Sequence, residues 1–290
     1  MRFYRIIFDQ HDEMAMGIDE NTIVRMADMG ISCNDFYDCI NMDSHQKSII
    51  SKNAKDKYKD CKKYNLEEVQ ILPPAAERMP DIICLGINYY DHAAEIKDIR
   101  KDKDDPTIYF SKRVTKPVGD KGYILSHSDI VKELDYEVEL LVIIGKDIYK
   151  ANKEEAKEAI WGYSIINDVS ARDIQLRHKQ WYRGKSLDGF TAIGPCIVTA
   201  DEIDDEQDLN ISCTVNGDLR QKSNTKYMIK KIVDAIVELS EGMTLTSGTM
   251  IATGTPGGVG KGMNPPSFLK HGDIVECYVE TIGTLTNTID

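Results

Sequence analysis

The 290-residue sequence lacks the features of a membrane or secreted protein. No apolar run approaches the ~20 residues that a membrane-spanning helix needs. The first residues, MRFYRIIFDQ, contain neither the apolar core nor the small-residue cleavage site of a signal peptide. We therefore expect a cytoplasmic protein that has no membrane partner.

Paired cysteine motifs and clustered positive charge are also missing. The seven cysteines are odd in number and form no CxxC pair, so we interpret them as reduced thiols and not as a disulfide framework or a zinc site. The net charge is −12. Nucleic-acid binding depends on clustered Lys and Arg, so we expect no nucleic-acid partner. The net charge does not exclude an anionic small substrate, because binding of such a substrate depends on the charge of the residues around the site.

Apolar strands ending in Gly, Asn or Asp dominate the sequence after residue 80. They include LLVIIG, GYSIIND, AIGPCIVT and GTMIATG. Helical patterns are fewer: KEEAKEAIWG, SARDIQLRHKQW, and KYMIKKIVDAIVELSEG, for which we expect Gly242 as the cap. The strands do not alternate regularly with helices. We therefore predict a β-rich, mixed α+β fold and not a doubly wound sheet.

The sequence divides into a small N-terminal unit, 1–71, and a larger domain, 72–290. The N-terminal unit begins with the strand-like MRFYRIIF and contains a charged helix or loop, NAKDKYKDCKKYNLEE. The prolines Pro73, Pro74 and Pro80 favour a boundary between the two parts.

Two acids precede the most apolar strand. Glu137 and Glu139 are two residues apart, so in a strand both side chains point to one face. Burying an unpaired carboxylate is costly, so this face is either solvated or neutralised by a cation. Oxygen ligands suit Mg²⁺, Mn²⁺ or Ca²⁺. Asp168, which closes GYSIIND, is a third candidate ligand, although it could also be a turn residue or a helix cap.

Two pairs of polar residues have the spacing of a helix face. Arg172 and Gln175 are three apart near an expected helix N-terminus, where they could hold an anionic group. His92 and Glu95 are also three apart, a common arrangement for a general base. Each pair also fits an ordinary surface contact.

Two glycine-containing segments do not match a phosphate-binding loop. Lys185 stands in a Gly-Lys-Ser triplet within strand-like surroundings, but the required earlier glycine is missing. In TGTPGGVGKG, Lys261 is followed by Gly and not by Ser or Thr. This second segment offers backbone N–H groups and the hydroxyls of Thr253 and Thr255, or it is a plain hairpin.

Five motifs occur in the order found in the fumarylacetoacetate hydrolase family. They are CLGINYYDHAAE, DYEVELLVIIG, NDVSARDIQ, GKSLDGFTAIGP and IATGTPGGVG. The sequence resembles this family over residues 72–290, and residues 1–71 resemble its variable N-terminal region. The resemblance implies a β-roll-like catalytic domain, a homodimer, and a bound Mg²⁺, with Mn²⁺ or Ca²⁺ as alternatives.

The resemblance also implies roles for individual residues. In relatives, the segment that corresponds to His92 and Glu95 closes over the site as a lid. The implied catalytic residues are His92, Glu95 and Lys185; the substrate-binding residues are Arg172, Gln175, Gly254 and Thr255; the metal ligands are Glu137, Glu139 and Asp168.

The resemblance implies a 2-oxo acid substrate whose enolate is stabilised by the metal. Our leading hypothesis is a hydrolase that cleaves a C–C bond in acylpyruvate-like 2,4-dioxo acids with water activated by His92 and Glu95. An oxaloacetate-type decarboxylase and a 2-hydroxyhepta-2,4-diene-1,7-dioate isomerase need the same enolate, so both stay open. A catalytically silent metal-binding relative is the alternative outside the enzymes.

One segment departs from the family pattern because it is rich in cations. It contains Lys112, Arg113, Lys116 and Lys121. It is either a solvated loop or a second anion-binding group, which would favour a dicarboxylate or a polar sugar acid as substrate.

Overall fold

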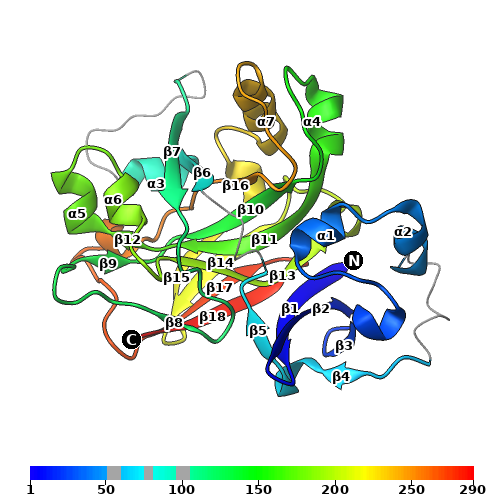
Figure 1. The fold of residues 1–290 in the computed structure, drawn as a ribbon. Coiled ribbons are helices and arrows are strands. Elements are labelled where there is room, and N and C mark those ends of the chain that lie inside the picture. Colours follow the sequence, from blue (N-terminus) through cyan, green and yellow to red (C-terminus); the bar gives the residue numbers. More distant parts are fainter. Residues whose placement is uncertain (51–59, 75–80, 96–104) are drawn as a thin grey trace.

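The computed structural model describes residues 1–50, 60–74, 81–95 and 105–290 (Figure 1). Two β-sheets pack against each other and share a hydrophobic core. Short helices lie around the sheets, and α3, α5 and α6 gather at one end of the molecule (Figure 1). That end carries the candidate site described below.

The larger sheet contains the strands predicted from LLVIIG, GYSIIND, AIGPCIVT and GTMIATG, which confirms those predictions. In spatial order, it consists of β4 (Tyr64–Asn65), β3 (Thr22–Arg25), β2 (His11–Gly17), β1 (Arg2–Phe8), β13 (Thr191–Thr199), β11 (Ile160–Asp168), β10 (Val138–Ile144), β16 (Met250–Ala252), β6 (Asp81–Gly86) and β7 (Ile108–Arg113), with β5 (Gln70–Leu72) paired to β1.

The smaller sheet packs on the central strands of the larger one. It consists of β15 (Asp218–Asn224), β14 (Asn210–Val215), β17 (Ile274–Val279), β18 (Gly283–Ile289) and β8 (Tyr123–Ile124). The antiparallel pair β17–β18 confirms the strand pair predicted near the C-terminus. A separate two-stranded ladder joins β9 (Leu134–Asp135) to β12 (Ser170–Ala171).

The helices are short. They are α1 (Phe36–Ile40), α2 (Ser44–Ile50), α3 (Tyr90–Glu95), α4 (Lys153–Ala159), α5 (Arg172–Arg177), α6 (Tyr182–Lys185) and α7 (Ile232–Ser240). Among the residues that the structure describes, no helix is long and apolar enough to cross a membrane. The seven cysteines are all free.

Helix α7 is shorter than its apolar pattern predicted. Its start is delayed because Asn88 binds the preceding backbone: the Asn88 carbonyl accepts from Ile229 N, and its side-chain oxygen accepts from Lys230 N at 2.7 Å. The expected cap at Gly242 is wrong, because Glu241 takes the C-cap position with right-handed backbone angles.

The N-terminal strands continue the larger sheet. Strand β1 pairs with β13 in antiparallel register, with Arg2 opposite Val198 and Phe3 opposite Ile197. Strands of residues 1–71 and of residues 72–290 thus share one sheet. The boundary between two domains at residues 71 and 72 stays a prediction. Residues 53–59 of the charged segment NAKDKYKDCKKYNLEE lie outside the described residues, and its end forms β4 and a 3₁₀ turn.

Strand β10 is buried on both faces. Leu140 and Val142 point into the core shared with the smaller sheet, whereas Leu141 and Ile143 point into a second core on the opposite face. Because side chains alternate along a strand, Glu137 and Glu139 continue the face of Leu141 and Ile143. An apolar face thus ends in carboxylates, and the neighbouring Asp168 extends them onto β11.

Candidate active site

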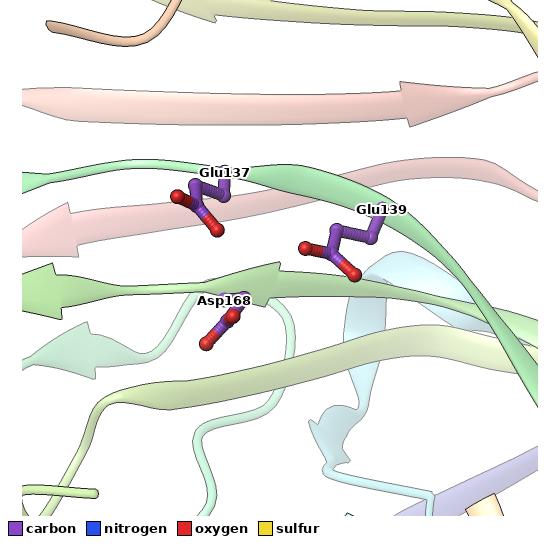
Figure 2. A group of neighbouring side chains, drawn as sticks. All are labelled: Glu137, Glu139 and Asp168. Carbon is purple, nitrogen blue, oxygen red and sulfur yellow. The ribbon is translucent and has the colours of Figure 1, made fainter. Parts of the chain in front are cut away.

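Three buried carboxylates form the centre of the site. Glu137 and Glu139 come from one strand and Asp168 from the next, as Figure 2 shows. The exposed fractions are 4% for Glu137, 2% for Glu139 and 0% for Asp168. One candidate ligand oxygen from each lies within 4.8 Å of the other two. The prediction that these three acids meet is confirmed, and the solvated alternative for the start of β10 is wrong.

Two buried lysines neutralise part of this negative charge. The Lys185 ammonium donates to Glu137 Oε2 at 2.5 Å and to Asp168 Oδ2 at 2.6 Å. The Lys112 ammonium donates to Asp168 Oδ1 at 2.6 Å and to the Val169 carbonyl at 3.2 Å. Both lysines are almost fully buried. Asp168 therefore has an ammonium on each carboxylate oxygen.

Arg172 joins the cluster to a fourth acid that the sequence analysis missed. Its Nε donates to Asp135 Oδ2 at 2.8 Å, its Nη2 lies 2.7 Å from Glu137 Oε1, and its Nη1 donates to Gln175 Oε1 at 3.2 Å. Asp135 is fully buried, and its carboxylate also accepts from the backbone N–H groups of Gly260 and Lys261. The planar guanidinium thus holds three partners in fixed directions.

Glu137, which directly precedes β10, and Glu139 on β10 differ in charge environment. Burial raises the pKa of Glu137, but Lys185 and then Arg172 outweigh burial and hold this pKa at about 2. Burial, reinforced by Asp168 and Glu137, raises the pKa of Glu139 well above its usual value. Glu139 accepts a hydrogen bond from Gly254 N at 2.7 Å, and no described Lys or Arg forms an ion pair with it. One carboxylate of the three is therefore poorly compensated by the protein.

This donor set fits a divalent cation. Three carboxylates supply hard oxygen ligands of the kind that Mg²⁺, Mn²⁺ and Ca²⁺ prefer. The poorly compensated charge of Glu139 is the clearest sign, because a cation there would offset the cost of burying it. The identity of the metal stays a prediction.

The predicted His–Glu pair lies on helix α3, beside the glycine-rich segment. His92 Nδ1 is 3.3 Å from Glu95 Oε2, and Glu95 Oε1 accepts from the backbone N–H of Gly258. Gly262 packs on the same carboxylate so closely that an added Cβ would lie 2.7 Å from Glu95 Cδ. The loop therefore orients Glu95, and Glu95 in turn contacts His92.

The segment that contains Gly254 and Thr255 lies against β10. The Thr255 hydroxyl donates to the Val138 carbonyl at 2.9 Å and accepts from Gln221 Nε2 at 2.8 Å. Gly254 has a φ of +89°, which favours glycine, and an added Cβ there would lie 2.7 Å from the Cβ of Asn88. The plain-hairpin alternative is wrong, because this segment donates to one acid of the cluster.

A cavity of about 800 Å³ opens onto these groups. Eight of the ten predicted site residues line it: His92, Glu95, Glu137, Glu139, Arg172, Gln175, Lys185 and Thr255. The other two, Asp168 and Gly254, contact lining residues through the hydrogen bonds above. Apolar side chains, including Phe110 and Trp181, complete the lining. A polar cluster enclosed by apolar groups is the usual composition of a small-molecule site.

Two local predictions need correction. Lys185 lies at the end of helix α6 and not in strand-like surroundings; Gly184 allows α6 to approach α5, since an added Cβ would lie 2.6 Å from Gln175 N. Asp168 does not cap α5, because Ala171 is in the N-cap position and no side chain caps it.

The cationic segment contributes one residue to the cluster. Lys112 is fully buried against Asp168, whereas Arg113, Lys116 and Lys121 are exposed. Lys112 donates to an acid of the site, and it does not line the cavity. The prediction of a second anion-binding group at this segment is therefore not supported by its position, and the solvated alternative describes the other three residues.

Asp135 could have been found from the sequence. Asp135, Glu137 and Glu139 form one alternating series, so a period of two places all three on one face. Lys112 has no such signal, because it is 56 residues from Asp168 and reaches the site only through the pairing of β6 with β7.

The chain is similar in sequence to proteins of one family. Residues 81–290 match the family model of the fumarylacetoacetate hydrolase C-terminal domain. The chain is 43% identical over 226 residues to oxaloacetate tautomerase YisK of Bacillus subtilis, an alignment that covers 78% of this chain and 75% of that protein.

Solved structures resemble the whole chain. A fumarylacetoacetate hydrolase from Exiguobacterium antarcticum is 35% identical with a TM-score of 0.87, covering 100% of this chain and 99% of that one. A 2-hydroxyhepta-2,4-diene-1,7-dioate isomerase from Mycobacterium marinum is 28% identical with a TM-score of 0.74, covering 100% and 98%. The predicted fold is confirmed, and the chain belongs to the fumarylacetoacetate hydrolase family.

Proposed function

We propose that this protein is a divalent-metal-dependent enzyme that interconverts the keto and enol forms of an oxaloacetate-type 2-oxo acid. The observation that carries the proposal is that Glu137 and Glu139, two acids of the buried Glu137–Glu139–Asp168 cluster, line the same cavity as the His92–Glu95 pair. This arrangement places a site for stabilising negative charge beside a group that can move a proton. The similarity to an oxaloacetate tautomerase supports the choice of reaction.

The three carboxylates would hold the metal. When bound, a divalent cation would supply Lewis acidity that stabilises negative charge on the 2-oxo oxygen of the substrate. Lys185 lies against Glu137 and Asp168 and adds a fixed positive charge to the same part of the cavity.

His92 would move the proton. In the tautomer whose Nδ1–H donates to Glu95, Nε2 is left to accept a proton from C3 of the keto form. The protonated ring would then donate a proton to the 2-oxo oxygen, which gives the enol, and the reverse transfers give the keto form. Glu95 holds the ring in this orientation and is itself fixed by the Gly258 N–H. The apolar side chains of Phe110 and Trp181 line the same cavity as His92.

Hydrolysis of an acylpyruvate-like 2,4-dioxo acid is the second candidate. The His92–Glu95 pair favours it, because the same base could activate a water molecule for attack on the distal carbonyl. The similarity to a fumarylacetoacetate hydrolase supports this alternative. Decarboxylation of oxaloacetate needs the same enolate but no base for water, so no contact in the cavity favours it separately.

The test follows the ultraviolet absorbance of enol oxaloacetate with purified protein and Mg²⁺ or Mn²⁺. Parallel assays measure released pyruvate and the cleavage of an acylpyruvate. We expect accelerated enol–keto conversion that exceeds pyruvate release, and a Glu139→Gln variant controls for catalysis by free metal. Cleavage of the acylpyruvate without any acceleration of the tautomerisation would replace this proposal with the hydrolase.

A further inference from the structure

Three cationic side chains line the cavity, and one of them has no acidic partner there. Arg172 is paired with Asp135 and Glu137, and Lys185 is paired with Glu137 and Asp168. The third is Lys261, whose ammonium forms no ion pair or hydrogen bond with the described residues. Acids of the protein already form ion pairs with Arg172 and Lys185. Lys261 is therefore the lining cation that can form an ion pair with a ligand.

The backbone around Lys261 is held firmly although its side chain is solvent-accessible. Lys261 lies in a 3₁₀ turn, Gly260–Gly262, and Asp135 accepts from the N–H groups of Gly260 at 2.7 Å and Lys261 at 3.1 Å. The same Asp135 carboxylate binds Arg172 Nε. One buried carboxylate therefore fixes the position of the loop relative to Arg172.

The same turn contacts Glu95, the residue that orients the proposed base His92. Gly262 packs on the Glu95 carboxylate, and both Lys261 and Gly262 line the cavity with His92 and Glu95. Partial burial, and then the charge of Arg172, lowers the pKa of Lys261. The positive charges of Arg172 and Lys261 thus face the same cavity, and an anionic group of a ligand would offset the repulsion between them.

We propose that Lys261 binds the distal carboxylate of a 2-oxo dicarboxylate and makes the enzyme selective for diacids over 2-oxo monoacids. This inference rests on the proposed function, in which the 2-oxo acid end of the substrate lies at the three carboxylates. The second negative charge of a diacid then needs a counter-charge elsewhere in the cavity. Arg172 and Lys185 are already paired with acids, and Lys261 supplies that charge.

The kinetic test compares oxaloacetate with its 4-methyl ester, which keeps the skeleton and removes the distal charge. Lys261→Met should lower kcat/KM for oxaloacetate roughly tenfold, mostly through KM, and change the value for the ester less than about twofold. Lys261→Arg should restore most of the preference for the diacid. Lys222→Met is the matched control, since Lys222 is exposed on β15 and does not line the cavity. Equal effects of Lys261→Met on both substrates would overturn the inference.

A binding measurement separates this inference from the proposed reaction. Malate and 2-hydroxybutyrate share the 2-hydroxy acid group, cannot enolise, and differ in the distal carboxylate. We expect the metal-loaded parent protein to bind malate more tightly by calorimetry, and Lys261→Met to remove that preference. Such a result supports the role of Lys261 even if no tautomerase activity is found. A parent protein without preference for malate would contradict it.

Discussion

Two parts of the cavity differ in how their charges are held. The cavity floor, as we define it, consists of buried residues that line the cavity or lie directly behind its lining: Glu137, Glu139, Asp168, Lys112, Lys185 and Arg172. Ion pairs connect all of them except Glu139. The cavity wall consists of His92, Glu95 and Lys261, which have fewer partners and greater exposure, with Glu95 at 23% for its side chain. The floor is built on strands of the larger sheet and on the short helices α5 and α6, whereas the wall is built on one short helix and a glycine-rich loop.

This difference assigns different parts of the reaction to the floor and the wall. Buried charges that are held by several partners would stabilise a developing negative charge without reorganising, which suits formation of the enolate in the proposed reaction. In the proposed reaction, the wall would supply the base His92 and the cation Lys261, which would contact the variable end of a substrate. Loss of a floor carboxylate should therefore abolish all activity, and changes to the wall should alter which substrate or reaction is favoured.

The largest expected effect is the loss of a floor carboxylate. Asp168→Ala removes one predicted metal ligand and leaves Lys112 and Lys185 without their shared acid. We expect kcat/KM to fall by about 10³-fold or more on every substrate, because a Lewis acid supplies several kcal/mol to the transition state. Steady-state assays with saturating Mn²⁺ check this. If the variant has the same kcat/KM as the parent protein, Asp168 has no role in the reaction.

Loss of the base in the wall should have a smaller effect that depends on the substrate. His92→Ala should slow tautomerisation and acylpyruvate hydrolysis by about 10²–10⁴-fold. It should slow oxaloacetate decarboxylation less, because that step needs no base to activate water. One preparation assayed on each substrate, with metal content checked and Glu95→Gln in parallel, gives the comparison. Equal losses would make the pair a positioning element for any bound substrate.

The buried lysine of the floor should matter for stability. Lys112→Met leaves Asp168 Oδ1 without its ammonium in a fully buried position, so we expect a loss of about 3–5 kcal/mol in the free energy of unfolding. Urea denaturation measures this value. The control is Lys116→Met, from the same segment but 67% exposed, which should change stability by less than about 0.5 kcal/mol. Similar values for the two variants would contradict the placement of Lys112.

The smallest expected effect concerns the shape of the Arg172 side chain. Arg172→Lys keeps the charge but cannot contact Asp135, Glu137 and Gln175 together. We expect a folded protein, checked by circular dichroism, with a KM for 2-oxo acids raised about tenfold. An unchanged KM on both oxaloacetate and an acylpyruvate would show that the three contacts of the guanidinium do not influence substrate binding.

The carboxylates of the floor were easier to predict from the sequence than the lysines that neutralise their charge. The alternation of Glu137 and Glu139 along β10 and the position of Asp168 at the end of β11 are local patterns, and the structure bears them out. The ion pairs of Lys112 and Lys185 join residues 56 and 17 positions from Asp168, and no local period encodes such contacts.

The wall was predicted in part. The spacing of His92 and Glu95 indicated a shared helix face, which α3 provides. The loop was harder, because its function depends on Asp135 binding two of its N–H groups across 125 and 126 residues. The predicted start of helix α7 was wrong, because hydrogen bonds between Asn88 and the preceding backbone outweighed the helical pattern. The homodimer, the metal and the cytoplasmic location stay predictions.

The central claim is that Glu137, Glu139 and Asp168 form one divalent-metal site, and calorimetric titration of the purified protein with Mn²⁺ tests it most directly. We predict one Mn²⁺ per chain, a higher melting temperature with metal, and loss of both effects in Glu139→Gln, which keeps the size of the side chain and removes its charge. Binding of Mn²⁺ with the same stoichiometry and affinity in parent and Glu139→Gln, or no binding to the parent, would contradict the account.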